Sequence, residues 1–489
     1  MRLVISAAHK SSGKTTVSLG LAAALAARGL RVQTFKKGPD YIDPIWLAAA
    51  SGRPCYNLDP YLSSWQEITS RFQQLSADAD FVLIEANKGL YDGLALDGSN
   101  SNAAVAARLQ APIILVLDAR GMTRGIAPLI LGYQSFDPSV HIAGVILNQL
   151  GGSRHESKLR QVIEHYTDVA VIGAMHKDAG ISLTERHLGL IPGNEMLDAA
   201  EKIDAIAQAV AAQVDLELLL QLAAQPIPAT AETKHIDQAE PTAAPATLDA
   251  GAKTKSAPGK ARQDIKIAIA RDRSFGFYYS DDLAALQAAG AELIAFDTLR
   301  DKCLPPADGL IIGGGFPESF AAELAANQCL KSDIRKLLAA GLPAYAECGG
   351  LVYLARSLRT IDGQTHAMCG VIPGDAVMRE HPTGRGYVHL EPSEHFPWPL
   401  ASKGEPRSSA GAPVIRAHEF HYSDLVNLPQ NLRYAWNVRR GHGLDGKHDG
   451  LVIANLLASY SHLRGTGECC WAERFVDYVA CRRNVRNAA

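Results

Sequence analysis

The sequence lacks long apolar segments, a strong net charge and a secretory leader. No run among its 489 residues approaches the ~18 consecutive apolar residues that a membrane span requires. The formal net charge is only −3, which gives no electrostatic argument for a nucleic-acid partner. The chain starts directly with a strand pattern and not with a signal peptide, which predicts a cytoplasmic protein. These absences disfavour membrane and nucleic-acid-binding functions.

The sequence also has little cysteine, and none of it is arranged to bind a metal. Its eight cysteines show no pair with the spacing of a zinc site. Cys469 and Cys470 are adjacent and are poorly placed to chelate one ion together. In a cytosolic chain such residues are expected to be free thiols. We therefore expect neither a disulfide framework nor a structural zinc site.

The sequence does contain two long segments in which short apolar strands alternate with helical stretches. Residues 1–222 and 264–489 each show this pattern, which is typical of a doubly wound α/β domain. Between them, residues 223–263 are rich in Ala, Pro, Thr and Lys and predict a flexible linker. Residues 199–222 are predicted to form the last helix of the first domain, and residues 400–413 a surface loop. The predicted fold class is therefore α/β, with two doubly wound domains.

The first domain begins with a sequence typical of a phosphate-binding loop. Residues 11–16 read Ser-Ser-Gly-Lys-Thr-Thr, between a strand pattern at 3–5 and a helical pattern at 17–27. Strand, loop and helix in this order are the context of such a loop in P-loop NTPases, whose backbone N–H groups point at phosphate oxygens. We predict that Lys14 reaches the outer phosphates of ATP and that Thr15 holds Mg²⁺. The remaining predicted nucleotide contacts are Ser12, Gly13 and Thr16.

Acidic residues follow two strands at what we expect to be the same sheet edge. Asp40 comes after a strand pattern at 32–35, and Glu85 ends an apolar strand at 81–85. Ligands of open α/β sheets bind at the carboxyl ends of the strands. Since Mg²⁺ prefers oxygen ligands and water, Asp40 and Glu85 are predicted to complete its shell. Asp92 lies in a glycine-bounded turn nearby and is a further candidate.

The second domain contains a cysteine placed between a strand and a helix. Residues 343–347 predict a strand, Cys348 is followed by Gly349 and Gly350, and a helical pattern starts at Leu351. This is the arrangement of a nucleophile elbow, with a thiol in place of a serine. The helix N-terminus favours the thiolate, and nearby N–H groups can form an oxyanion hole.

A cysteine nucleophile needs a base, and three histidines are candidates. His418 and His421 lie close together in the sequence, and His462 lies nearer the C-terminus after another strand pattern. The two residues after His462 are not acidic, so no third carboxylate is evident.

The two halves resemble known enzyme domains. The first resembles the dethiobiotin-synthetase-like ATPase domain, and the second resembles the triad type of class I glutamine amidotransferase, whose fold is flavodoxin-like. In this order they resemble the cobyrinic acid a,c-diamide synthase family, over residues 1–200 and about 265–480. The resemblance rests on the cysteine elbow and on the segments 35–44 (Phe-Lys-Lys-Gly-Pro-Asp-Tyr-Ile-Asp-Pro), 89–93 (Gly-Leu-Tyr-Asp-Gly), 144–148, 185–190 and 418–423.

The resemblance implies an ATP-dependent amidation of peripheral acetate carboxylates on a tetrapyrrole. ATP phosphorylates a carboxylate to an acyl phosphate, which is then attacked by ammonia. Cys348 releases that ammonia from L-glutamine, and His462 matches the imidazole that activates the cysteine. The family uses matching positions for metal, substrate or intermediate at Asp40, Tyr41, Glu85 and Asp92. The assembly implied for this enzyme is a possible homodimer.

Some positions depart from the family pattern. Ala8 replaces the usual first glycine of the phosphate loop, so its opening bend is expected to differ. Residues 86–88 read Ala-Asn-Lys where the family has a Gly-Val-Met type of stretch, and residues 97–102 also differ. These differences leave a second hypothesis, a glutamine-dependent amidase of sirohydrochlorin or sirohaem that serves sulfite reductase. Two further alternatives are a partition-type ATPase and a nucleotide sensor with an inactive amidotransferase domain.

Overall fold

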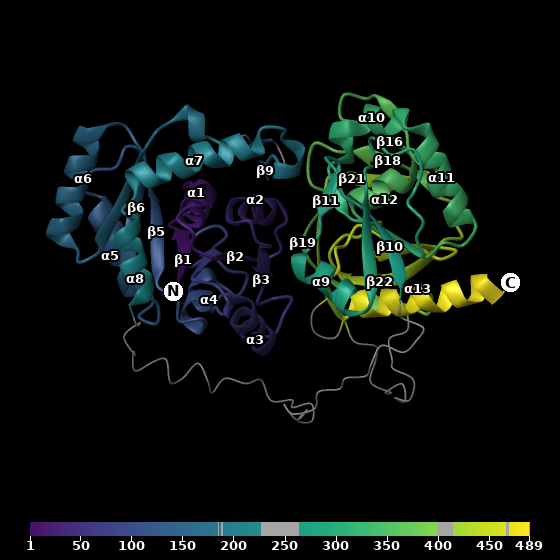
Figure 1. Cartoon of the computed structure of the whole chain (residues 1–489), viewed down its shortest axis with the longest axis horizontal. Helices are drawn as coiled ribbons and strands as arrows, with labels where there is room; N and C mark the ends of the chain where they lie inside the picture. The colour runs from purple at the N-terminus through teal and green to yellow at the C-terminus, as the bar shows by residue number, and fades with distance from the viewer. Residues whose placement is uncertain (184, 187–188, 226–263, 399–413, 466–468, 489) are drawn as a thin grey trace. The chain divides into compact units, whose positions relative to one another are not determined.

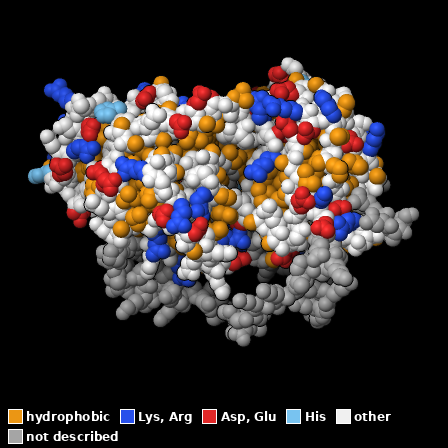
Figure 2. Space-filling view, in the orientation of Figure 1, with side chains coloured by type: hydrophobic (Ala, Val, Ile, Leu, Met, Phe, Trp, Pro, Cys, Tyr) orange, Lys and Arg blue, Asp and Glu red, His pale blue; other side chains and the backbone are white. Residues whose placement is uncertain are grey.

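The computed structural model describes residues 1–489 except 184, 187–188, 226–263, 399–413, 466–468 and 489. The chain divides into two compact units, Met1–Lys253 and Thr254–Ala489 (Figure 1). Almost all of the predicted linker, and the whole predicted loop at 400–413, lie outside the described residues, so both remain predictions. No helix in the described chain is both long and apolar enough to cross a membrane. On the face shown in Figure 2, acidic and basic side chains are interspersed over both units.

The N-terminal unit is a parallel sheet between two layers of helices. Its strands are β1 (Arg2–Ala7), β2 (Val32–Lys37), β3 (Tyr56–Leu58), β4 (Phe81–Glu85), β5 (Ile113–Asp118), β6 (Ile142–Leu150) and β7 (Ala170–His176), with a separate antiparallel pair, β8 (Glu185–Arg186) and β9 (Gly189–Leu190). Its helices are α1 (Lys14–Ala27), α2 (Ile42–Ser51), α3 (Trp65–Ser76), α4 (Asn102–Arg108), α5 (Ile126–Phe136), α6 (Ser153–Tyr166), α7 (Ala199–Gln213) and α8 (Leu216–Ala224), with short 3-10 turns at Ala179–Ile181 and Gly193–Glu195.

The seven strands have the order β3-β2-β4-β1-β5-β6-β7, and every neighbouring pair is parallel. Helices α1, α2, α7 and α8 bury their apolar side chains on one face, and α3, α4, α5 and α6 on the other. Because both faces are covered, the central strands read as continuous apolar runs and not as alternating ones. The predicted doubly wound domain is confirmed. Its strand order places the phosphate loop after β1 beside the carboxyl end of β4.

The helix predicted over residues 199–222 is wrong in one respect, because the segment forms two helices. α7 ends at Gln213, and Val214 leaves the helix to form an antiparallel backbone bridge with Gly173 of β7. Asp215 then starts α8, since its Oδ1 accepts a hydrogen bond from the N–H of Leu218 at 2.9 Å. An Asp at the N-cap satisfies a free backbone donor and favours a new helix start.

The C-terminal unit combines a large mixed sheet with a smaller one. Its strands are β10 (Ile265–Ala270), β11 (Phe275–Phe277), β12 (Ala291–Phe296), β13 (Gly309–Ile312), β14 (Gly314–Gly315), β15 (Ala344–Glu347), β16 (Ala355–Arg359), β17 (Thr365–Ala367), β18 (Ile372–Met378), β19 (Gly384–Pro392), β20 (Ile415–His421), β21 (Ser423–Val426), β22 (Arg433–Arg440), β23 (His448–Ile453) and β24 (Leu456–Ser459). Its helices are α9 (Ser280–Ala288), α10 (Ala321–Ala326), α11 (Gln328–Ala339), α12 (Gly349–Leu354) and α13 (Trp471–Ala488), with a 3-10 turn at Pro317–Phe320.

The large sheet has the order β12-β10-β13-β15-β24-β23-β22-β19-β20. The half from β12 to β24 is parallel, and the half from β24 to β20 is antiparallel. Helices α9 and α13 pack on one face, while α10, α11, α12 and the four-stranded sheet β17-β16-β18-β21 cover the other. The parallel half supplies the predicted α/β domain. Within this half, β15 lies between β13 and β24 and ends directly before Cys348.

The turn from β15 into α12 depends on close packing at Gly350. A Cβ atom at this position would lie 2.1 Å from the carbonyl oxygen of Ile312 in β13. The backbone of β13 cannot shift easily to make space, because it is hydrogen-bonded on both sides, to β10 and to β15. Glycine therefore lets α12 lie against the strand that neighbours β15.

We expect Gly350→Ala to lower the stability of the C-terminal unit by about 1–3 kcal/mol, because the added methyl group overpacks the strand–helix contact. The measurement is thermal unfolding followed by circular dichroism. Gly132→Ala is the control, because Gly132 lies in α5 and a Cβ there meets nothing within 4 Å. That substitution should be neutral or slightly stabilising. Equal melting temperatures for Gly350→Ala and the wild type would contradict the packing argument.

Candidate active sites

The phosphate-loop candidate lies between β1 and α1, as predicted. α1 begins at Lys14, and its N-cap Gly13 has a left-handed φ of 91°. A Cβ at Gly13 would lie 2.0 Å from Nδ2 of Asn148, the amide that donates to the carbonyl of Ser12 at 2.8 Å. Ala8 is not among the positive-φ residues, and the loop's left-handed positions are instead Ser11 and Gly13. The expected difference in the opening bend is therefore accommodated later in the loop.

The side chain of Lys14 is buried, at 7 % exposure, at the start of α1. Burial, with a further contribution from Lys36, lowers the pKa of Lys14 to about 8. An ammonium group held in this way gains strongly when an anion arrives, because the anion replaces the lost hydration. Thr16 lies two residues after Lys14 in α1. Ser12 is fully buried, and its hydroxyl donates to the carbonyl of His9 at 2.9 Å.

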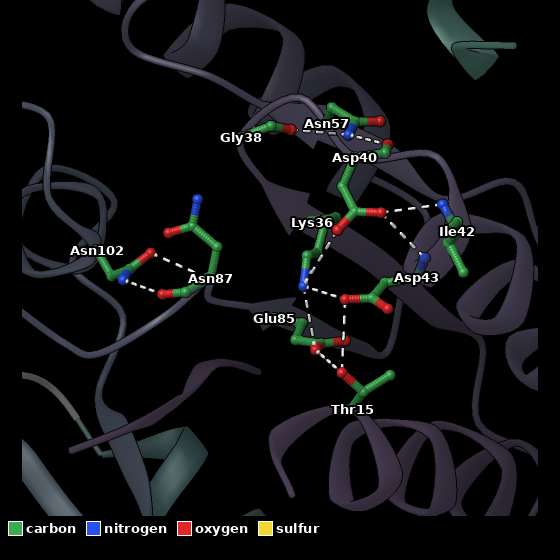
Figure 3. Close-up of polar contacts among 10 residues, drawn as sticks. All are labelled: Thr15, Lys36, Gly38, Asp40, Ile42, Asp43, Asn57, Glu85, Asn87 and Asn102. Atoms are coloured by element: carbon green, nitrogen blue, oxygen red, sulfur yellow. Dashed lines mark hydrogen bonds and ion pairs between the residues drawn. The ribbon is translucent and has the colours of Figure 1, made fainter. Parts of the chain in front are cut away.

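Next to the loop, Lys36 lies within a group of three carboxylates (Figure 3). Its Nζ pairs with Asp43, lies 3.1 Å from Oε1 of Glu85, and lies 3.9 Å from Oδ2 of Asp40. The hydroxyl of Thr15 donates to the same Glu85 oxygen at 2.7 Å. The predicted residues Thr15, Asp40 and Glu85 therefore do converge. Lys36 and Asp43 join them, and the sequence reasoning had assigned no role to either.

Burial and mutual repulsion set the charges of this group. Burial, with Asp43 adding to it, raises the pKa of Asp40 to about 7 against the opposing effect of Lys36. Burial likewise raises the pKa of Glu85, again opposed by Lys36. For Lys36, burial lowers the pKa, but the attraction of Asp43, Glu85 and Asp40 outweighs it and the pKa rises. The lysine thus stays charged and balances acids that would otherwise repel one another.

The residues present fit a magnesium ion that arrives with nucleotide. The Oε2 atom of Glu85 is buried and has no hydrogen-bond partner, which leaves one carboxylate oxygen free beside Thr15. In the part of the chain that is described, no three His, Cys, Asp or Glu side chains form a ready metal cluster. Mg²⁺ is commonly held by one or two carboxylates together with phosphate oxygens and waters.

Two further predicted residues lie in the loops around this group. Tyr41 is buried directly before α2, and Asp40 fixes that helix start because its Oδ1 accepts the N–H groups of Ile42 and Asp43, at 2.9 and 3.1 Å. Asp92 is exposed after β4, and its Oδ2 accepts the N–H of Gly89 at 2.8 Å.

The cysteine candidate forms a strained elbow between β15 and α12. Cys348 has φ 47° and ψ −103°, a conformation that non-glycine residues rarely adopt. Its N–H donates to the carbonyl of Ser459 at 2.7 Å, which ties the elbow to the end of β24. Such strain at a strand–helix turn presents the side chain outward, and Cys348 is partly exposed.

His462 contacts both the cysteine and a carboxylate. Its Nδ1 lies 3.2 Å from Oε2 of Glu347, and burial leaves the imidazole 3 % exposed. Burial lowers its pKa, but hydrogen bonds with Cys348 and Glu347 outweigh this effect and raise the pKa of His462 to about 10. The arrangement favours an imidazolium beside the thiol. It also corrects the expectation that no third carboxylate is present. That group comes from the residue before the cysteine and not from those after the histidine.

The other two candidate histidines have different surroundings. His418 stacks on His462, with ring centroids 4.9 Å apart, and its Nδ1 lies 3.3 Å from the hydroxyl of Tyr279. Burial, with the charges of His462 and Arg464, holds its pKa well below the usual value. His421 bonds the carbonyl of Ser423 and stacks on Tyr460. Of the three, His462 is the one placed to take the thiol proton of Cys348 and hold it as an imidazolium beside the thiolate.

Comparison with known proteins agrees with this division of the chain. A family model described as a CobQ/CobB/MinD/ParA nucleotide binding domain matches residues 4–191, and one described as a CobB/CobQ-like glutamine amidotransferase domain matches residues 266–467. Cobyrinate a,c-diamide synthase of Magnetococcus marinus is 40% identical over 471 residues, which are 96% of this chain and 95% of that protein. The enzyme of the same name from Methanosarcina acetivorans is 38% identical, over 95% of this chain and 92% of that protein.

The chain belongs to the cobyrinate a,c-diamide synthase family. With its nucleotide-binding and amidotransferase domains, it is a glutamine-dependent ligase that forms amide bonds. The resemblance drawn from the sequence is thereby confirmed. The partition-type ATPase alternative shares the nucleotide-binding family, but it explains neither the second domain nor the full-length relatives.

Residues missed from the sequence are those whose role depends on tertiary pairing. Glu347 adjoins the cysteine and was visible in the motif, but only the elbow shows that both side chains reach His462. Asp43 was likewise visible three residues after Asp40. Its position became informative once α2 placed it against Lys36.

We expect Glu347→Gln to reduce glutaminase activity at least about 10-fold and to shift its alkaline limit to lower pH. The sign follows from the pKa. In the wild type the imidazolium persists until the pH rises through about 10, whereas loss of the carboxylate lets burial depress the pKa of His462. The measurement is the pH profile of glutamine hydrolysis. The exposed Glu323→Gln in α10 is the matched control and should leave the profile unchanged. An unshifted alkaline limb in Glu347→Gln would show that Glu347 does not support the imidazolium.

Proposed function

We propose that the protein amidates peripheral carboxylates of a cobyrinate-type tetrapyrrole, using ATP, Mg²⁺ and L-glutamine. The observation that carries the proposal is the presence in one chain of two separate chemical centres, a phosphate loop beside Lys36 and its carboxylates and a Cys348–His462–Glu347 group. A carboxylate is a poor electrophile, so an amide ligase must first give it a leaving group. It must also supply ammonia that is not protonated by bulk water.

In the N-terminal unit the proposed step is phosphoryl transfer from ATP to a substrate carboxylate. An oxygen of that carboxylate attacks the γ-phosphorus, ADP leaves, and an acyl phosphate forms. Lys14 binds the phosphates, with contacts from Ser12, Gly13 and Thr16. Mg²⁺, when bound, neutralises phosphate charge, and the residues proposed to hold it are Thr15, Asp40 and Glu85. Tyr41 and Asp92 are proposed to contact the substrate or the intermediate from the surrounding loops.

In the C-terminal unit the proposed step is hydrolysis of glutamine through a thioester. The Cys348 thiolate attacks the side-chain amide carbonyl, and the His462 imidazolium donates a proton to the amide nitrogen, so that the C–N bond breaks, ammonia leaves and a thioester forms. Water then releases glutamate, with His462 accepting the proton. Glu347 orients the imidazole and stabilises its charged form. Ammonia attacks the acyl phosphate, and phosphate leaves as the amide forms.

Substrate identity rests on the relatives, which are cobyrinate a,c-diamide synthases at 35–40% identity. Cobyrinate is therefore the first substrate to test. The sirohydrochlorin or sirohaem hypothesis is retained because three segments depart from the family pattern, Ala86-Asn87-Lys88 directly after Glu85, residues 97–102, and His9-Lys10 before the phosphate loop. A homodimer and a cytoplasmic location remain further proposals.

The two centres should be separable by mutation. Cys348→Ala is expected to lower glutamine-dependent amidation at least about 10³-fold, since it removes the nucleophile, yet to retain amidation with added ammonium. Lys14→Ala should abolish amidation with either nitrogen source, because both routes need phosphoryl transfer. The measurement is product formation from glutamine and from ammonium in parallel. A Cys348→Ala protein that is inactive with ammonium would contradict the division of labour.

The substrate is tested by mass spectrometry of products formed with ATP, Mg²⁺ and glutamine from cobyrinate, sirohydrochlorin and sirohaem. Each amidation replaces OH by NH₂ and lowers the mass by about one unit, a consequence of the acyl transfer. We expect a loss of about two units on cobyrinate. A loss of about one unit on sirohydrochlorin or sirohaem, with cobyrinate unchanged, would assign the protein to sirohaem modification.

A further inference from the structure

Four lysine side chains are buried in the described part of the chain, and two of them are fully accounted for. Lys36 pairs with Asp43 and Glu85. Lys331, in the C-terminal unit, donates to the carbonyls of Ala325 and Ala367 at 2.7 Å each. Buried ammonium groups need such partners, because removing the charge from water is costly.

The other two, Lys14 and Lys37, are each only 7 % exposed, and neither makes a hydrogen bond or ion pair with any described residue. For Lys14 the explanation is the phosphate loop, whose lysine binds ATP. Lys37 has no such explanation. Its side chain is largely buried, and burial lowers its pKa, so an anion arriving from outside the chain would be bound favourably there.

The position of Lys37 indicates which anion. It is the last residue of β2, so it lies at the carboxyl edge of the sheet, where ligands of such sheets bind. Since side chains alternate along a strand, it faces away from Lys36 and from the phosphoryl-transfer group around Glu85. The phosphates of ATP belong to the loop after β1. A partner on this other side of β2 comes from the substrate.

The two acidic side chains whose charges act on Lys37 are already hydrogen-bonded to other groups. Burial lowers the pKa of Lys37; Asp59 and Asp92 oppose this effect, and Lys88 adds to it. The Oδ1 of Asp59 accepts the N–H groups of Tyr61 and Leu62, at 2.9 and 3.4 Å, and Asp92 accepts the N–H of Gly89. Both acids are thus engaged by the backbone of their own loops.

Lys88 is presented from the loop after β4 in a fixed conformation. It is exposed and has a left-handed φ of 44°, which costs a non-glycine residue about 1 kcal/mol. Asn102 holds the backbone on both sides of it, since its Nδ2 donates to the carbonyls of Asn87 and Gly89 at 2.6 Å each (Figure 3 shows the contacts with Asn87). The Oδ1 of Asn102 also accepts the N–H of Asn87 at 3.2 Å. This strain and this clamp keep Lys88 at the sheet edge.

We propose that Lys37 and Lys88 form a binding subsite for a substrate carboxylate other than the one that is phosphorylated. The inference rests on the proposed function and adds to it a requirement for a substrate with at least two carboxylates. Lys37 binds the carboxylate in a buried position, and Lys88 covers it from the solvent side. The subsite holds the substrate in one orientation while the reacting carboxylate faces the γ-phosphate.

The test compares Lys37→Met, Lys88→Met and the control Lys158→Met, an exposed lysine in α6. Kinetics are measured with ammonium as nitrogen donor and with cobyrinate as substrate, or with sirohydrochlorin if the wild type amidates that instead. We expect KM for the tetrapyrrole to rise at least about 10-fold in Lys37→Met and about 3-fold in Lys88→Met, with KM for ATP within about 2-fold of wild type. Lys37→Arg, which keeps the charge, should recover part of the affinity.

Thermal unfolding without ligands gives a second readout. Because Lys37→Met removes a buried charge without a described partner, its melting temperature should equal or exceed that of wild type. If Lys37 had a structural role, the substitution would lower the melting temperature. A raised KM for ATP would make the ligand a phosphate and overturn the proposal, as would unchanged KM values or a destabilised Lys37→Met. If the wild type amidates no tetrapyrrole, the proposed function itself fails. If the wild type amidates a tetrapyrrole but the variants keep its KM values, the subsite proposal fails while the proposed function stands.

Discussion

The N-terminal site depends on one buried ammonium group, that of Lys36. Three carboxylates converge on it, and without it their burial would force them to bind protons or move apart. With it, Asp40 and Asp43 can stand at the start of α2 while Glu85 remains buried at the end of β4 and accepts from Thr15. Burial lowers the pKa of Lys14, and the charge of Lys36 lowers it further. One cation thus positions the acids and prepares the phosphate loop for an anion.

The C-terminal site depends on a backbone constraint instead. β15 pairs in parallel with β24, with Glu347 opposite Ser459, which brings His462 back to the end of β15. Adjacent residues of a strand normally point to opposite faces. The left-handed conformation of Cys348 breaks that alternation, so that Glu347 and Cys348 both reach one imidazole. Strain at a single residue therefore assembles a group of three from two neighbouring residues and one distant one.

Much of this architecture was predictable, and the limits have physical causes. The parallel first sheet, the phosphate loop and the cysteine elbow follow from local patterns, since apolar runs, glycines and turn residues act over a few positions. β4 was predicted to the residue. The break at Asp215 was missed, because a capping aspartate inside an amphipathic stretch competes with helix continuation. Glu347, Lys36 and Asp43 were missed as functional groups because their roles arise from contacts between separate elements. The burial of Lys37 without a described partner can be seen only in the folded structure, not in the sequence.

In the proposed reaction, a substrate carboxylate is activated by phosphorylation before ammonia attacks it. The most direct measurement uses cobyrinate with ¹⁸O in its acetate carboxylates, in a reaction with ATP, Mg²⁺ and glutamine. Because the carboxylate oxygen bridges to phosphorus in an acyl phosphate, one ¹⁸O atom should appear in inorganic phosphate for each amide formed. Product amide accompanied by phosphate without ¹⁸O would contradict the acyl phosphate, and with it the proposed role of the N-terminal site.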